Sequence, residues 1–373
     1  MIYLDHAATS FQKPQAVYAA VRQAMLTMSS PGRGGYAPAR RAEELLFRTR
    51  ALAADLFGVP EPERVVFTAS ATHGLNIAIK SLVPVGGRAV ISGYEHNAVT
   101  RPLHALRAEV AVAAAPPFDR KACLRRFEKE LRRGADAAVC TTVSNVFGCI
   151  LPVEEIAALC RRLRIPLIVD ASQSAGVLPL DASALGAAFV AMPGHKGLCG
   201  PQGTGLLLCG ADPVPLIEGG TGSASLRQEM PGDLPDRLEA GTHNVPGIAG
   251  LEAGLRFVRR QTCERILRHE RRLVRRAAAG LRQMGGVTVF AAPDEADQTG
   301  VLSFFAEGKE PEETAQALAA RGIAVRAGYH CAPTAHDSAG TLEHGTVRLS
   351  VSAFNTDAEI DAFLRAMRGA LGQ

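Results

Sequence analysis

The stretch Ala191-Met-Pro-Gly-His-Lys-Gly-Leu-Cys-Gly-Pro-Gln-Gly-Thr-Gly205 is a glycine-rich loop that contains one lysine, Lys196. Apolar runs that resemble strands flank it at 187–192 and 205–209, so the pattern predicts a tight reversal between two buried strands. A lysine in such a loop is most often solvated. Taken alone, the loop therefore leaves open whether Lys196 is a surface residue or a functional one.

A second stretch, 166–170, is a short apolar run that ends in the carboxylate of Asp170. This pattern is typical of a buried parallel strand, whose carboxyl end lies where open α/β sheets place their ligands. A carboxylate buried at that edge needs a cationic partner. The protonated ring nitrogen of pyridoxal 5'-phosphate (PLP) is one such partner, and a lysine that binds PLP covalently would supply the other half of the site.

The rest of the chain alternates strand-like and helix-like segments from residue 64 onward, which predicts a parallel sheet covered by helices. We expect an α/β fold with a large, doubly wound domain over residues 15–250. The smaller α+β domain is expected to comprise 251–373 together with the N-terminal arm 1–14. The segment 210–250 is rich in glycine and proline and predicts a long functional loop. Strands are expected at 65–68, 88–92, 136–142, 165–170, 287–290, 301–305, 323–326 and 347–351, and helices at 14–28, 39–57, 69–82, 154–164, 310–321 and 356–371.

Composition and charge indicate a globular chain. Hydrophobic residues make up 47% and charged residues 21% of its 373 residues, and the net charge is +4. No apolar run reaches the length of a membrane span, so we expect a cytoplasmic protein that binds no membrane. Ten arginines lie within 256–282 among apolar residues at helical spacing. This pattern favours a solvated arginine face over a packed stripe, with a nucleic-acid surface as the less favoured alternative.

The eight cysteines include no Cys-x-x-Cys pair and no Cys/His spacing that predicts a metal site. Most lie in apolar surroundings, where a buried and inert thiol is expected. Cys331 differs because it lies in a loop directly after His330, and a neighbouring imidazole can activate a thiol. We therefore expect Cys331 to be the reactive cysteine.

Three motifs carry a family resemblance: Asp170-Ala-Ser-Gln173, Gly194-His-Lys196 and Ala327-Gly-Tyr-His-Cys-Ala-Pro333. In their order and spacing they resemble the cysteine desulfurases of aminotransferase class V, in the SUF-type and selenocysteine-lyase-like branch. The likeness extends from Tyr3 to Thr356, nearly the whole chain. It implies a fold-type I PLP-dependent transferase that acts as a homodimer on L-cysteine or L-selenocysteine.

The resemblance also implies roles for individual residues. Lys196 would bind PLP, Asp170 would hold its ring nitrogen, and His96 would stack on the ring. Arg348 would bind the substrate carboxylate, a task suited to its bidentate fork. Positions that match cofactor-binding residues of the family are Thr72, His96, Asn145, Asp170, Gln173, His195, Lys196 and Thr242, the last reaching the phosphate in the partner subunit. Substrate-binding positions are Ala7, Asn145 and Arg348, and catalytic positions are Lys196, Cys331 and His96.

In this reading the Cys331 thiolate attacks the sulfur of bound cysteine, which leaves alanine and a persulfide for an acceptor protein. Three alternatives stay open: a selenocysteine lyase, a class V aminotransferase or epimerase in which Cys331 is incidental, and a non-enzymatic module that uses the arginine-rich helix. The chain also departs from the family pattern. Pro193 and Ala71 remove two hydroxyls from the expected phosphate site, and His6, His243 and Tyr329 replace residues typical of better-known members.

Overall fold

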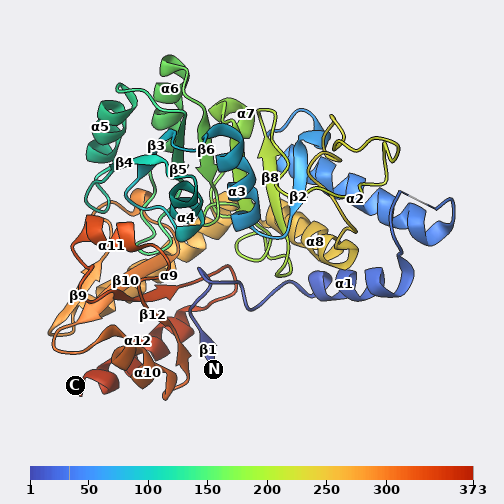
Figure 1. Cartoon of the computed structure of the whole chain (residues 1–373). Helices are drawn as coiled ribbons and strands as arrows, with labels where there is room; N and C mark the ends of the chain where they lie inside the picture. Colours follow the sequence, from blue (N-terminus) through green and yellow to red (C-terminus); the bar gives the residue numbers. More distant parts are fainter. Residues whose placement is uncertain (33, 373) are drawn as a thin grey trace.

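A seven-stranded mixed sheet forms the centre of the larger part of the molecule (Figure 1). The structure is a computed structural model that describes residues 1–32 and 34–372. Only β8 runs antiparallel to its neighbours, and the other adjacent pairs are parallel. In spatial order the strands are β2 (Val65–Thr68), β8 (Gly205–Cys209), β7 (Phe189–Pro193), β6 (Leu167–Asp170), β5 (Ala137–Thr141), β3 (Arg88–Ser92) and β4 (Glu109–Ala113).

Helices cover both faces of this sheet, because the central strands are apolar on both sides. One face packs against α3 (Ala71–Leu82) and α4 (Asn97–Ala105). The opposite face packs against α2 (Ala37–Leu56), α5 (Arg120–Leu131), α6 (Val153–Leu163) and α7 (Ala182–Leu185). The expected doubly wound α/β architecture is therefore confirmed.

The C-terminal third forms a smaller antiparallel sheet in the order β12 (Arg326–Gly328), β13 (Thr346–Ser350), β10 (Val301–Ala306) and β9 (Val287–Phe290). A separate apolar core joins this sheet to its helices. The N-terminal strand β1 pairs in parallel with β11, so the first residues of the chain lie against its last third (Figure 1). The remaining elements of this part are β1 (Ile2–Tyr3), β11 (Ile323–Ala324), α9 (Cys263–Arg282), α10 (Pro311–Ala319), α11 (Pro333–Ala339) and α12 (Asp357–Leu371).

Helix α8 (Val245–Gln261) connects the two parts and packs against α1 (Gln15–Thr27) and α2. It begins inside the segment 210–250, so the long loop expected there ends at residue 244. The domain division at residue 250 stays a prediction, and α8 spans that position. No helix of the described residues is long and apolar enough to cross a membrane.

The arginine-rich region 256–282 contains two helices rather than one. They are separated at Thr262, whose φ of 64° interrupts the helical backbone. Arg256 pairs with Glu252 at 2.8 Å, and Arg276 pairs with Asp361 at 2.6 Å. These arginines therefore form a solvated face paired with acidic side chains, as the helical pattern indicated.

Candidate active site

Lys196 lies in the loop between β7 and β8, which pair antiparallel up to Pro193 and Gly205. Backbone bonds close this loop tightly: the N–H of Gly194 donates to the carbonyl of Thr204 at 2.8 Å, and that of Gly200 donates to the carbonyl of Gly194 at 2.7 Å. The expected reversal between two buried strands is confirmed. These backbone hydrogen bonds hold the part of the loop from which the Lys196 side chain extends.

Asp170 ends β6, directly beside β7, and its side chain is almost fully buried. The backbone N–H of Ser172 donates to its Oδ1 at 2.9 Å. Burial lowers the pKa of Lys196 to about 8, although the charge of Asp170 acts in the opposite direction. The amine of Lys196 is therefore partly unprotonated near neutral pH, as a nucleophilic or basic lysine requires.

His96 caps the N-terminus of α4, and its Nδ1 accepts a hydrogen bond from the N–H of Ala98 at 3.0 Å. Burial lowers the pKa of His96, while Asp170 opposes this shift and Lys196 adds to it. The charges of Asp170 and Lys196 therefore act on the His96 ring. At neutral pH the His96 ring is therefore an uncharged imidazole.

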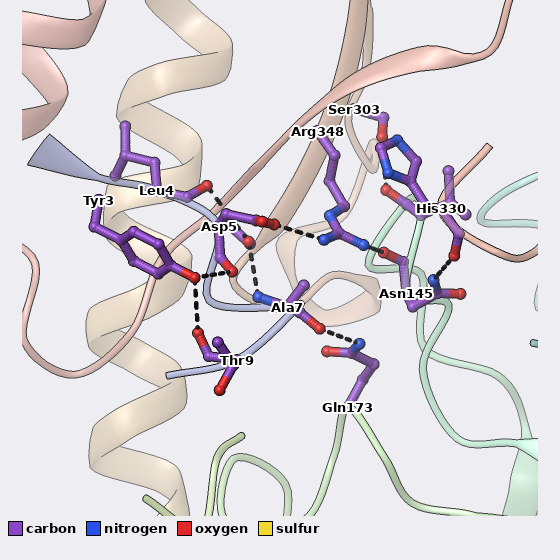
Figure 2. A network of polar contacts seen from close by, with 12 residues as sticks. Tyr3, Leu4, Asp5, Ala7, Thr9, Asn145, Gln173, Ser303, His330 and Arg348 are labelled. Carbon is purple, nitrogen blue, oxygen red and sulfur yellow. Dashed lines mark hydrogen bonds and ion pairs between the residues drawn. The ribbon is translucent and has the colours of Figure 1, made fainter. Parts of the chain in front are cut away.

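Arg348, in β13, lies between Asp5 and Asn145 in a polar network (Figure 2). Its Nη2 donates to Oδ1 of Asp5 at 2.7 Å, and its Nη1 donates to the carbonyl of Asn145 at 3.0 Å. The Nε of this buried guanidinium has no hydrogen-bond partner among the described residues. The arginine therefore retains a donor for a further acceptor. Sequence reasoning missed Asp5 as its partner.

The N-terminal segment 4–10 is tied to this network and to the Lys196 loop. The backbone N–H of Ala7 donates to Oγ of Ser350 at 2.8 Å, and its carbonyl accepts from Nε2 of Gln173 at 3.0 Å (Figure 2). Nδ1 of His195 lies 3.0 Å from Oγ1 of Thr9. Burial lowers the pKa of His195 to about 4, with a further contribution from Lys196, so its ring is neutral.

Cys331 lies in the turn after β12 and is exposed. His330 and Cys331 both have left-handed backbones, with φ of 51° and 57°, which costs roughly 1–2 kcal/mol for each residue. Two hydrogen bonds hold this strained turn: Nδ2 of Asn145 donates to the carbonyl of His330 at 2.8 Å, and the N–H of Asn97 donates to that of Cys331 at 2.7 Å. The backbone of the turn is thus fixed to Asn145, a predicted site residue, and to Asn97, the residue after His96.

The other seven cysteines are less accessible. Six are buried and Cys263 is partly buried. Burial raises the pKa of Cys199 and Cys209 to about 12 and that of Cys263 to about 11, so these groups stay thiols at neutral pH. Among the described cysteines, Cys331 alone is exposed.

Thr72 lies at the exposed N-terminus of α3, where Oγ of Ser70 caps the helix by accepting from the N–H of His73 at 3.2 Å. Thr242 is also exposed and lines a separate pocket of about 200 Å³ with Ala69 and His73. Thr242 is therefore near the start of α3 in its own chain, whereas the cavity that contains Lys196 does not include it.

Glu239, which sequence reasoning did not single out, holds the segment before Thr242 within the same chain. Its carboxylate accepts from the backbone N–H of Phe67 at 2.6 Å, from Nη1 of Arg50 at 2.7 Å and contacts Nε2 of His243 at 2.6 Å. Burial raises the pKa of Glu239, but the hydrogen bonds from His243 and Arg50 outweigh this and hold it below its usual value. No local sequence signal predicts this anchor, because its partners are up to 189 residues apart.

Known proteins match this chain over nearly its whole length. The family Aminotransferase class-V matches residues 2–363. A "Probable cysteine desulfurase" of Mycolicibacterium paratuberculosis is 34% identical, and the match covers 99% of this chain and 55% of the relative. A relative of the same description from Methanothermobacter thermautotrophicus is 30% identical over 96% of this chain and 92% of its own length.

Two solved structures share the fold. A cysteine desulfurase from Thermococcus onnurineus has a TM-score of 0.90 and 30% identity, covering 100% of this chain and 95% of the other. One from Escherichia coli has a TM-score of 0.85 and 26% identity, covering 99% and 94%. The chain spans only 55% and 62% of two mycobacterial relatives. With a family match over almost every residue and a solved structure of the same fold at 30% identity, this chain belongs to the aminotransferase class-V family.

Proposed function

We propose that this protein is a PLP-dependent cysteine desulfurase that converts L-cysteine to L-alanine and carries the sulfur on Cys331. The observation that carries the proposal is the position of that thiol. It is exposed, in a strained turn whose backbone is bonded to Asn145 and to Asn97, the residue after His96. The names of the relatives support the same activity.

The residues present fit PLP. Asp170 offers a buried carboxylate for a protonated ring nitrogen, and Lys196 offers an amine whose pKa is lowered to about 8. The N-terminus of α3 at Thr72 offers backbone N–H groups to a phosphate. His96 is uncharged and can lie against an aromatic ring. When bound, PLP would supply an electron sink for the bonds at the α-carbon of an amino acid.

The protein's own groups then have separate tasks. Arg348 would bind the substrate carboxylate through its free donor, and Asn145 and Gln173 would orient the cofactor. Lys196 would take the proton from the α-carbon and return a proton to the product. The Cys331 thiolate would attack the substrate sulfur, so that an S–S bond forms as the C–S bond breaks. The electron pair of that bond stays on carbon, which takes up the proton to give alanine.

We further propose a homodimer, in which Thr242 contacts the phosphate of the partner subunit. Its exposed position supports this, because a contact across an interface requires an accessible side chain. The exposed thiol also suits transfer of sulfur to an acceptor protein. All eight cysteines are free thiols, which fits the reducing cytoplasm proposed as the location.

The experiment is an assay of the PLP-loaded protein with L-cysteine and a reductant. Equal amounts of alanine and sulfide are expected. Alanine from L-selenocysteine but not from L-cysteine would favour a selenocysteine lyase, and a keto acid without sulfide would favour an aminotransferase. A protein that neither binds PLP nor absorbs visible light when purified would overturn the enzymatic proposal altogether.

A further inference from the structure

A small cavity of about 50 Å³ is lined both by Lys196 and by residues of α9. Its walls come from the N-terminal segment, the segment that follows β6, the Lys196 loop, α8, α9, the start of β10 and the end of β13. The volume suffices for a few ordered water molecules, provided polar groups are present to bind them. The cavity thus joins the predicted catalytic lysine to the junction between the two sheets.

Glu270 of α9 lines this cavity and is only 5% exposed. Its carboxyl has no hydrogen bond or ion pair with any residue that the structure describes. Gly300 makes room for the carboxyl, because a Cβ there would lie 2.6 Å from Oε2 of Glu270. An unpaired buried carboxyl costs free energy, so a protein that keeps one and leaves space beside it satisfies the group in another way.

His6 is a second unsatisfied group in the same cavity. It is 5% exposed, its Nε2 lies 3.3 Å from Oγ of Ser352, and its Nδ1 has no partner within residues 1–32 and 34–372. Burial lowers the pKa of His6 to about 4, so the ring is neutral. Two buried polar side chains from distant parts of the chain therefore share one small space, which indicates a site built for ordered water.

We propose that Glu270 exchanges protons with Lys196 through water in this cavity. This inference rests on the proposed role of Lys196. In the exchange, the carboxylic acid of Glu270 gives a proton to water and water gives one to the amine of Lys196. A carboxylate and an ammonium group result, and the reverse transfer restores both. Glu270 supplies protons to Lys196 and accepts them from it without touching substrate, and Lys196 remains the group that acts on substrate.

The energetics permit this exchange. Burial raises the pKa of Glu270 to about 8, and burial lowers that of Lys196 to about 8. Matched values make transfer between the two groups nearly thermoneutral. The other titratable residues that line the cavity, within the part of the chain described, are His6 and Cys199. Burial raises the pKa of Cys199 to about 12, with Lys13 opposing and Glu270 adding to the shift, so it stays a thiol.

The first test uses the cofactor-free protein and does not depend on the activity. Infrared spectra of the wild type minus Glu270→Gln should show a protonated carboxylic acid at pH 7 that ionises near pH 8. In a Lys196→Met background this ionisation should stay near pH 8, because burial alone raises the pKa of Glu270. A carboxyl that is already ionised at pH 6 would overturn the proposal.

The second test follows the label of L-cysteine deuterated at the α-carbon into alanine, in ordinary water. In the wild type the deuterium should exchange with solvent before alanine forms. Alanine from Glu270→Gln should retain at least about twofold more deuterium, since the lysine then returns the same proton that it removed. Glu270→Met, which removes the unpaired carboxyl and should fold at least as stably, is expected to behave alike. Glu252→Gln is the matched control, because Glu252 is also buried but pairs with Arg48 and Arg256 outside the cavity.

The label pattern separates the two proposals. Equal label retention in the wild type and both Glu270 variants would overturn the proton exchange while leaving the desulfurase proposal intact. If no alanine forms at all, the proposed function fails, and the infrared titration alone decides the role of Glu270.

Discussion

Asp5 and Arg348 form a buried ion pair across almost the whole length of the chain, with Oδ1 and Nη2 2.7 Å apart (Figure 2). The side chain of Arg348 is 2% exposed and that of Asp5 is 18% exposed. Burial lowers the pKa of Arg348, and the charge of Asp5 opposes this. Asp5 of the N-terminal segment thus neutralises the arginine that we propose binds substrate. It also holds the guanidinium group in position through Nη2.

Asp5→Asn should destabilise the protein by roughly 3 kcal/mol, because it leaves the buried guanidinium of Arg348 without its counter-charge. The loss is measured by urea denaturation of the cofactor-free protein. Asp361→Asn is the matched control, since the Asp361–Arg276 pair is on the surface and should contribute little. Equal midpoints for both variants would show that Asp5 does not stabilise Arg348.

Lys196→Met should stabilise the cofactor-free protein at pH 7, by an amount on the order of 3 kcal/mol. The unfolded chain keeps the lysine proton up to about pH 10.5, whereas the folded chain releases it near pH 8. The wild type therefore gains stability as the pH rises from about 8 to 10.5, and its deficit against the variant should close in that window. Exposed Lys80→Met is the control, and a pH-independent difference for Lys196→Met would refute the lowered pKa.

Asp170→Asn should keep the fold but lose turnover. The neutral amide still accepts the hydrogen bond from Ser172, yet it does not stabilise a protonated ring nitrogen. Circular dichroism and the alanine assay together check this. Turnover at the wild-type rate in this variant would show that a group other than Asp170 keeps the ring nitrogen protonated.

Local sequence patterns were enough to predict the strands that position Asp170 and Lys196. The apolar run before Asp170 and the glycines around Lys196 are properties of adjacent residues, so β6, β7 and β8 were predicted within about two residues. The hydrophobic pattern did not predict elements that contain a helix breaker or bury few of their residues. Helix α4 contains Pro102, edge strand β4 is largely exposed, and α5 has only three buried residues among its charges. None of these three elements was predicted.

Other residues of the site were not predicted from the sequence for a different reason. Asp5 pairs with a residue 343 positions away, and Glu270 lines the same cavity as Lys196, which is 74 positions away in the chain. No period of 2 or 3.6 residues carries such information. The strained backbone of Cys331 was equally hidden, because non-glycine residues rarely adopt a left-handed conformation.

Cys331→Ser should still bind PLP and L-cysteine but release neither sulfide nor alanine, because a hydroxyl is a poor nucleophile toward divalent sulfur. The fold should survive, since the anchoring bond from Asn97 uses the backbone carbonyl. Cys263→Ser, the next most accessible cysteine, is the control and should retain its rate. Wild-type release of sulfur by Cys331→Ser would leave a generic class V enzyme with an incidental thiol.

Peptide mass spectrometry of the PLP-loaded protein, after one exposure to L-cysteine without reductant, shows directly whether Cys331 carries the sulfur. We expect one additional sulfur atom on the peptide that contains Cys331, one alanine released per subunit, and no added sulfur on the other seven cysteines. Alanine formation with the sulfur on another cysteine, or with no sulfur bound to the protein, would contradict the proposed role of Cys331.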